Sequence, residues 1–239
     1  MRFIDKLLNW IFPPKCVCCD EILDYESEEI FCENCLLEWE ILKKEKCRTC
    51  GQPLWECYCG MRDNHDGLVD AELHLVQYDK KLDNAVNKLV FSCKDRTVSA
   101  YFRGVAKEMY KCLYPRLPKD SYVVMPVPRT RLAKKMKGHD QSEFIAKEFC
   151  KLDDFIYCDL IYNVGEKSQK LSVNQRERSE NAKKSYKIMQ DNEKILKGRN
   201  VILIDDVITT GSSVVRCAKL IKSKGAKKVY AFSIAKTVR

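Results

Sequence analysis

The stretch from Val201 to Ser213 reads VILIDDVITTGSS, and it decides the fold. Its first four residues, 201–204, are all apolar, which is typical of a central strand buried on both faces of a sheet. Two carboxylates, Asp205 and Asp206, follow at once and precede a run of small residues. This order predicts a strand, a loop and a helix, with polar groups at the carboxyl end of the strand, where α/β sheets bind ligands.

The loop of small residues is suited to binding a phosphate group. Its backbone N–H groups can approach a ligand closely, and the N-terminus of the next helix adds free donors and a favourable dipole. A strand followed by a simply capped helix would need only one such polar residue. The residues predicted to hold the phosphate are Thr209, Thr210, Gly211, Ser212 and Ser213.

The two carboxylates cannot serve the phosphate itself, because ionised Asp side chains only accept hydrogen bonds. Asp205 and Asp206 suit ribose hydroxyls, which donate to them, or a divalent cation. Together with the loop they predict a site for a 5-phosphorylated ribose.

Strands and helices alternate around this stretch and indicate a mainly parallel α/β sheet. The helix after the loop should stop at Gly225. Strands are expected at 71–78, 122–128, 155–162, 200–207 and 228–235, and helices at 82–90, 98–113, 142–152 and 212–224.

Nine of the 14 cysteines lie between Cys16 and Cys59, and turn-forming residues follow near residues 60–67. This change of composition predicts a small Cys-rich module at 1–65 and an α/β domain at 66–239. No apolar run approaches the roughly 20 residues of a membrane-spanning helix, and no cleavable signal is recognisable. A cytoplasmic location with reduced thiols is expected, with membrane association only through a partner.

Eight of these cysteines form two sets suited to tetrahedral zinc, because two closely spaced thiolate pairs complete one site. We expect one or two structural Zn²⁺ ions, since four cysteines leave no open coordination position. In the second set the last pair is more tightly spaced, and His65 is an alternative ligand there. The sets are Cys16, Cys19, Cys32 and Cys35, and Cys47, Cys50, Cys57 and Cys59.

The net charge of +9 is unevenly placed. Residues 1–60 have 7 Lys and Arg against 12 Asp and Glu, whereas the remaining residues have 36 against 22. The α/β part should therefore meet an anionic partner, although a solvated Lys-rich surface would give the same composition. Residues 129–137 carry five basic side chains, of which Lys134, Lys135 and Lys137 are candidates to touch phosphates or nucleic acid.

VILIDDVITTGSS resembles the ribose-phosphate motif of the phosphoribosyltransferase family at every position. The resemblance implies a type I phosphoribosyltransferase fold and a site for phosphoribosyl pyrophosphate (PRPP). It also implies that Asp205 and Asp206 hold the two ribose hydroxyls and that Mg²⁺ accompanies the pyrophosphate. A loop after the 122–127 strand would bind the pyrophosphate.

A narrower resemblance, to the ComF group, covers nearly the whole chain. It rests on residues 12–19, on Gly138 to Gln141, and on 168–172 with Arg176, Arg178 and Asn181. Membership would imply a zinc module joined to a phosphoribosyltransferase-like domain, single-stranded DNA binding by loops 129–137 and 167–187, and support for DNA uptake in natural transformation. A competence helicase is then a candidate partner.

The chain departs from the ComF group at one loop. The group has Arg-Gly-Phe-Asn-Gln where this chain has Lys137 to Gln141, so that a guanidinium fork is lost and Asp140 adds a negative charge. Two other functions therefore stay open. One is an active phosphoribosyltransferase that moves ribose 5-phosphate from PRPP to an unknown nitrogenous base, and the other is a ligand-sensing regulator.

Overall fold

The architecture was analysed in a computed structural model. It describes residues 13–24, 29–57, 59, 66–79, 84–85, 87–90, 99–130, 134–135, 140–164, 186–189 and 193–237. The predicted module boundary at residue 65 lies outside these residues. No helix in the described ranges is long and apolar enough to cross a bilayer.

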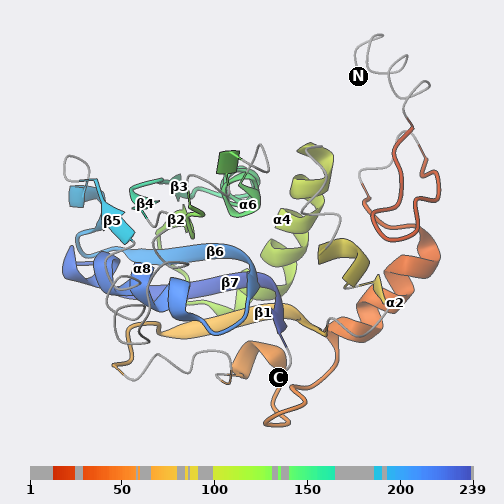
Figure 1. Ribbon diagram of the computed structural model, residues 1–239, viewed down its shortest axis with the longest axis horizontal. Coiled ribbons are helices and arrows are strands. Elements are labelled where there is room, and N and C mark those ends of the chain that lie inside the picture. The colour runs from red at the N-terminus through yellow and green to blue at the C-terminus, as the bar shows by residue number, and fades with distance from the viewer. Residues whose placement is uncertain are drawn as a thin grey trace, which may run out of the picture.

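Five strands form the main sheet in the order β1-β7-β6-β2-β3, and each neighbouring pair is parallel. The carboxyl ends of the strands therefore meet at one edge of the sheet, on the right in Figure 1. The mainly parallel sheet predicted from the sequence is confirmed. The strands are β1 (Ala71–Tyr78), β2 (Tyr122–Pro126), β3 (Ile156–Tyr157), β6 (Asn200–Ile208) and β7 (Lys228–Thr237).

Helices cover both faces of the sheet, and the alternation of side chains along β6 shows why. Ile202 and Ile204 belong to one buried cluster with α4 (Ser99–Leu113) and α6 (Gln141–Cys150), which lie above the sheet in Figure 1. Val201 and Leu203 belong to a second cluster with α8 on the opposite face. The remaining elements of this domain are α8 (Ser212–Ser223) and the 3₁₀ turns η2 (Tyr114–Arg116) and η4 (Glu193–Leu196).

The single strand expected at 155–162 is wrong, because the structure has two short strands there. Cys158 still donates its N–H to the carbonyl of Val124 in β2 (3.0 Å), but Leu160 accepts the N–H of Met189 (2.9 Å). The chain thus changes partners within three residues. The second strand, β4 (Ile161–Asn163), pairs antiparallel with β5 (Tyr186–Ile188) in a separate small sheet.

The Cys-rich module includes α2 (Glu33–Lys43) and η1 (Leu54–Glu56), and it packs beside α4 and β1. Trp39 is fully buried, and its Nε1 donates to Glu108 of α4 (2.9 Å). A Cβ added to Gly104 would lie 2.4 Å from Ile30 Cγ2, so the absence of a side chain permits this close approach. The module and the α/β domain therefore share one hydrophobic core.

The two sets of four cysteines are each gathered in space, with all four sulfur atoms of a set within 4.8 Å of one another. Tetrahedral zinc with Zn–S bonds of about 2.3 Å would place its sulfurs about 3.8 Å apart. The Sγ atoms of Cys19 and Cys32 are 3.6 Å apart, as are those of Cys50 and Cys57. The geometry and the all-sulfur donor set fit one structural zinc ion in each cluster.

We predict two zinc ions per chain. Cys35→Ser and Cys50→Ser should each lower the zinc content from two ions to one, because each removes one ligand from a different cluster. Elemental analysis of purified protein measures this content. Cys150→Ser, which lies outside both clusters, is the control and should keep two. A single ion in the unchanged protein would contradict the prediction.

Candidate functional site

The loop after β6 forms a small polar hollow at the carboxyl edge of the sheet. Gly211 adopts a left-handed conformation (φ +73°) directly before α8, which a side chain would strain. The hydroxyls of Thr210 and Ser212 lie 2.8 Å apart, and Asp205 lines the same cavity of ≈ 60 Å³. The structure thus brings together the residues predicted for the phosphate: Thr209, Thr210, Gly211, Ser212 and Ser213.

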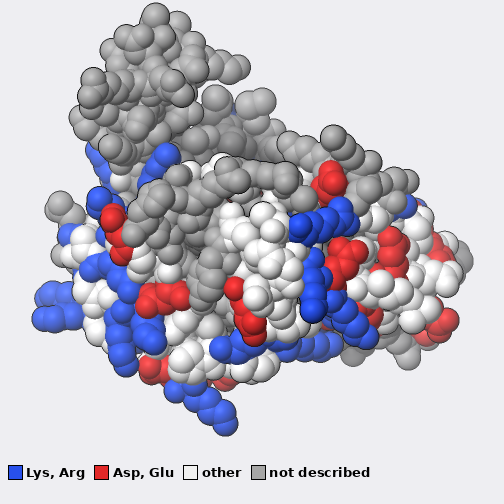
Figure 2. Space-filling model, turned by 90° about the horizontal axis from the view of Figure 1, so that it is seen from below, with Lys and Arg blue, Asp and Glu red and all other residues white. Residues whose placement is uncertain are grey.

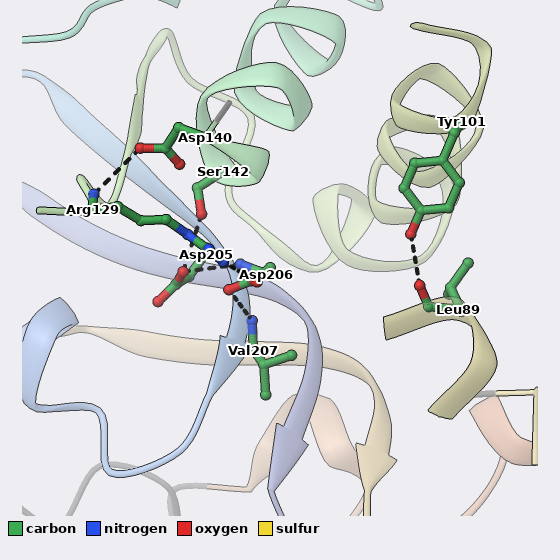
Figure 3. A network of polar contacts seen from close by, with 8 residues as sticks. All are labelled: Leu89, Tyr101, Arg129, Asp140, Ser142, Asp205, Asp206 and Val207. Atoms are coloured by element: carbon green, nitrogen blue, oxygen red, sulfur yellow. Dashed lines mark hydrogen bonds and ion pairs between the residues drawn. The ribbon is translucent and has the colours of Figure 1, made fainter. Parts of the chain in front are cut away.

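The two carboxylates at the end of β6 have different partners (Figure 3). Asp205 Oδ1 accepts hydrogen bonds from the Ser142 hydroxyl (3.1 Å) and the Asp206 backbone N–H (3.0 Å). Asp206 Oδ2 lies 2.6 Å from Arg129 Nη2, and its Oδ1 accepts the N–H of Val207 (2.8 Å). One carboxylate therefore has a cationic partner and the other has only neutral donors.

This difference perturbs the ionisation of Asp205. Burial and the neighbouring Asp206 carboxylate raise the pKa of Asp205 well above its ordinary value, and the hydrogen bonds from Ser142 and the backbone offset only part of that effect. A carboxyl group that ionises with difficulty next to a phosphate-sized hollow is typical of a functional site. A hydrogen bond donated to this carboxyl group would favour its ionised form.

The basic loop after β2 is arranged differently from the expectation. Lys134 lies 3.2 Å from Asp140 and 3.2 Å from Glu143. Partial burial acts to lower the pKa of Lys134, but the two carboxylates outweigh it and the pKa is raised. Lys135 is exposed, and Lys137 lies outside the described residues. Of the three predicted lysines, Lys134 is thus already held by carboxylates.

Arg129, Asp140 and Ser142 are site residues that the sequence reasoning did not select. Arg129 is one of the five basic residues in 129–137. Its position directly after Pro128, at the carboxyl end of the β2 strand, is the sequence signal that distinguishes it from the other four. Asp140 accepts the Arg129 N–H (3.3 Å) and holds Lys134, so the charge that departs from the ComF pattern is compensated within the loop.

A second, larger cavity of ≈ 220 Å³ adjoins Arg129 between the end of β2 and the small β4–β5 sheet. Burial raises the pKa of Asp159 in its wall. The loop 168–172 with Arg176, Arg178 and Asn181 lies outside the described residues. The cavity is lined by Pro128, Arg129, Lys134, Asp159, Ile161, Tyr162, Asn163 and Met189.

Two family models match the chain. A double zinc ribbon domain matches residues 7–66, and a phosphoribosyl transferase domain matches residues 124–237. The first covers both cysteine clusters, and the second covers the basic loop, the carboxylate pair and the loop of residues 209–213.

Relatives match over most of their own length. Competence protein F of Haemophilus influenzae is 22% identical over 86% of this chain and 90% of its own. Competence protein ComFC of Bacillus subtilis is 25% identical over 89% and 86%, respectively. DNA utilization protein YhgH of Escherichia coli is 24% identical over 82% and 86%. The resemblance to the ComF group predicted from the sequence is therefore confirmed over most of the chain, which combines a double zinc ribbon domain with a phosphoribosyl transferase domain.

Proposed function

We propose that this protein binds a 5-phosphorylated ribose ligand, PRPP or a close relative, and also single-stranded DNA, in support of DNA uptake. The observation that carries the proposal is the cavity in which Asp205 meets the hydroxyl-rich loop, with Asp206 as the next residue of β6. Such a hollow offers acceptors for sugar hydroxyls and donors for a phosphate within one site.

The contacts of the ligand follow from the chemistry of each group. Asp205 and Asp206 accept the two ribose hydroxyls, and residues 209–213 surround the 5-phosphate. Mg²⁺ accompanies the pyrophosphate, for which the carboxylates and ligand oxygens are suitable hard donors. Arg129 offers a guanidinium fork beside Asp206, so it supplies a cation near the pyrophosphate in place of the carboxylate-bound Lys134.

Single-stranded DNA is the second ligand in the proposal. Relatives of similar length carry the names competence protein and DNA utilization protein. The α/β part has a large excess of basic residues, and loops 129–137 and 167–187 would contact the DNA backbone. On the face seen from below in Figure 2, basic side chains are interspersed with acidic ones, so charge does not mark the path of a DNA strand there.

The cellular setting completes the proposal. We place the protein in the cytoplasm, where incoming single strands emerge, with a competence helicase as partner and membrane association through that partner. Reduced thiols in the cytoplasm are compatible with two clusters of zinc-binding cysteines. The described cysteines form no disulfide.

An active phosphoribosyltransferase is the second candidate, favoured by the cavity of ≈ 220 Å³ beside Arg129. This cavity adjoins the ribose site and has both apolar and polar walls, as a site for an acceptor base requires. Pyrophosphate release, assayed with a panel of nitrogenous bases, separates the candidates. PRPP binding without turnover favours the DNA-uptake role.

The ribose assignment predicts that Asp205→Asn combined with Asp206→Asn weakens PRPP binding by at least about 100-fold, since two charge-assisted hydrogen bonds are lost. Calorimetric titration in the presence of Mg²⁺ measures the affinity. The adjacent exposed carboxylates Asp153 and Asp154 provide a matched control: their double Asn variant should bind PRPP normally. Equal affinity in both double variants would refute the assignment.

The raised pKa of Asp205 predicts that Asp205→Asn alone stabilises the ligand-free protein at neutral and alkaline pH. A group whose pKa is raised in the folded state favours folding at low pH, and this contribution is lost as the pH rises through the folded-state pKa. Asn does not ionise, so the variant should have a higher Tm than the wild type at pH 8. The difference should shrink towards pH 4, and a constant difference across this range would contradict the prediction.

The DNA assignment predicts that Lys135→Ala with Lys137→Ala lowers the salt dependence of binding to single-stranded oligonucleotides. Each lost phosphate contact reduces the slope of log K against log salt by about 0.7, so the double variant should lose about 1.4. Lys227→Ala with Lys228→Ala removes an equal charge from the opposite, amino-terminal end of the sheet and should change the slope less. Equal losses in both pairs would show binding to charge in general and not to this loop.

A further inference from the structure

A buried lysine at the end of β7 has no carboxylate partner among the described residues. Lys236 is only 5% exposed, and its Nζ lies 2.7 Å from Cys57 Sγ. None of the ion pairs between described residues includes Lys236. An ammonium group is costly to bury without a compensating anion. Cys57 is the partner that can supply this anion.

Cys57 becomes an anion when its cluster holds metal. Zinc is bound by thiolates, and four thiolates around Zn²⁺ leave a net charge of −2. A cation that donates a hydrogen bond to one of these sulfurs lowers the repulsion between them. We propose that Lys236, acting through Cys57, is a positioning residue that retains the zinc ion of the second cluster.

The neighbouring strand, β1, contacts the backbone around Cys47, which belongs to the other cysteine pair of the same cluster. Gln77 of β1 stands in register with Lys236 of β7. Its Oε1 accepts the N–H of Arg48 (3.1 Å) and its Nε2 donates to the carbonyl of Lys46 (2.7 Å), so that it holds the backbone on both sides of Cys47. Two adjacent strands therefore fix both ligand pairs of the second cluster from the carboxyl edge of the sheet.

The first cluster has no comparable support. Among the described residues, no lysine or arginine donates to Cys16, Cys19, Cys32 or Cys35. The thiol of Cys18, which is not a member of the cluster, donates to the carbonyl of Ala85 (3.5 Å), and Cys16 and Cys32 are buried in the core shared with the α/β domain. The first cluster is therefore joined to the α/β domain by apolar packing, and the second by a cationic donor.

Zinc transfer from the full-length protein to a chromogenic chelator tests the proposal. Lys236→Met keeps the apolar stem but removes the donor, and loss of such supporting contacts commonly weakens metal binding by about 10- to 100-fold. One of the two zinc ions should be released about 10-fold faster or more, while the other keeps its rate. Cys35→Ser, which disables the first cluster, shows which release phase belongs to the second.

Two further variants separate this role from general packing. Lys236→Arg keeps a cationic donor and should restore most of the retention. Lys43→Met removes a partly buried lysine that pairs with Glu108, and it should leave both release rates unchanged. Unchanged release from Lys236→Met, or equal acceleration of both ions, overturns the proposal.

The absorption spectrum of the cobalt-substituted protein separates the two roles, because loss of packing alone would leave the sulfur-to-metal bands unchanged. A hydrogen bond from a cation alters the sulfur-to-metal charge-transfer bands, so Lys236→Met should shift the bands of the second cluster only. If Lys236→Met does not fold, Lys236→Gln provides the same comparison with a neutral donor. Spectra identical to those of the wild type overturn the proposal.

Discussion

The position of β6 is the constraint on which the rest of the structure depends. This strand pairs with β7 on one edge and with β2 on the other, and its apolar residues are buried on both faces. Such a strand has no freedom to shift, because any slip would break two ladders and two packed layers. The carboxylates Asp205 and Asp206 within its carboxyl-terminal half, and the start of the loop that follows it, are therefore held at fixed positions.

The burial that holds β6 in place also makes an ionised carboxylate on this strand unfavourable for folding. Asp205 sits at the end of a buried strand, and both burial and Asp206 oppose its ionisation. Asp206 is compensated by Arg129, which comes from the end of the neighbouring strand β2. Among the described residues no cation pairs with Asp205, so its ionised form opposes folding.

The sequence predicts those parts of the molecule whose residues are consecutive or closely spaced along the chain. The motif at 201–213 has its apolar run, carboxylates and loop in consecutive positions, and the cysteine pairs are equally local. The carboxylate partners of Lys134 could not be predicted in the same way. Its contact with Asp140, six residues further along the chain, forms only because the loop between them folds back. The break at Cys158 was not predicted for a similar reason, since one largely apolar run at 155–162 fits two short strands in different sheets as well as one long strand.

The packing of the zinc module against the α/β domain could not be predicted from the sequence either, because it joins residues that are far apart in the chain, such as Trp39 and Glu108. A module of this size buries too little apolar surface to be stable alone and needs metal or a partner surface. Here it has both, since its aromatic residues enter the core of the α/β domain. The second cluster is tied to β7, and Lys236 of β7 stands opposite Ile208, the last residue of β6. The Cys-rich module and the loop that follows β6 are thus attached at the same carboxyl end of one sheet.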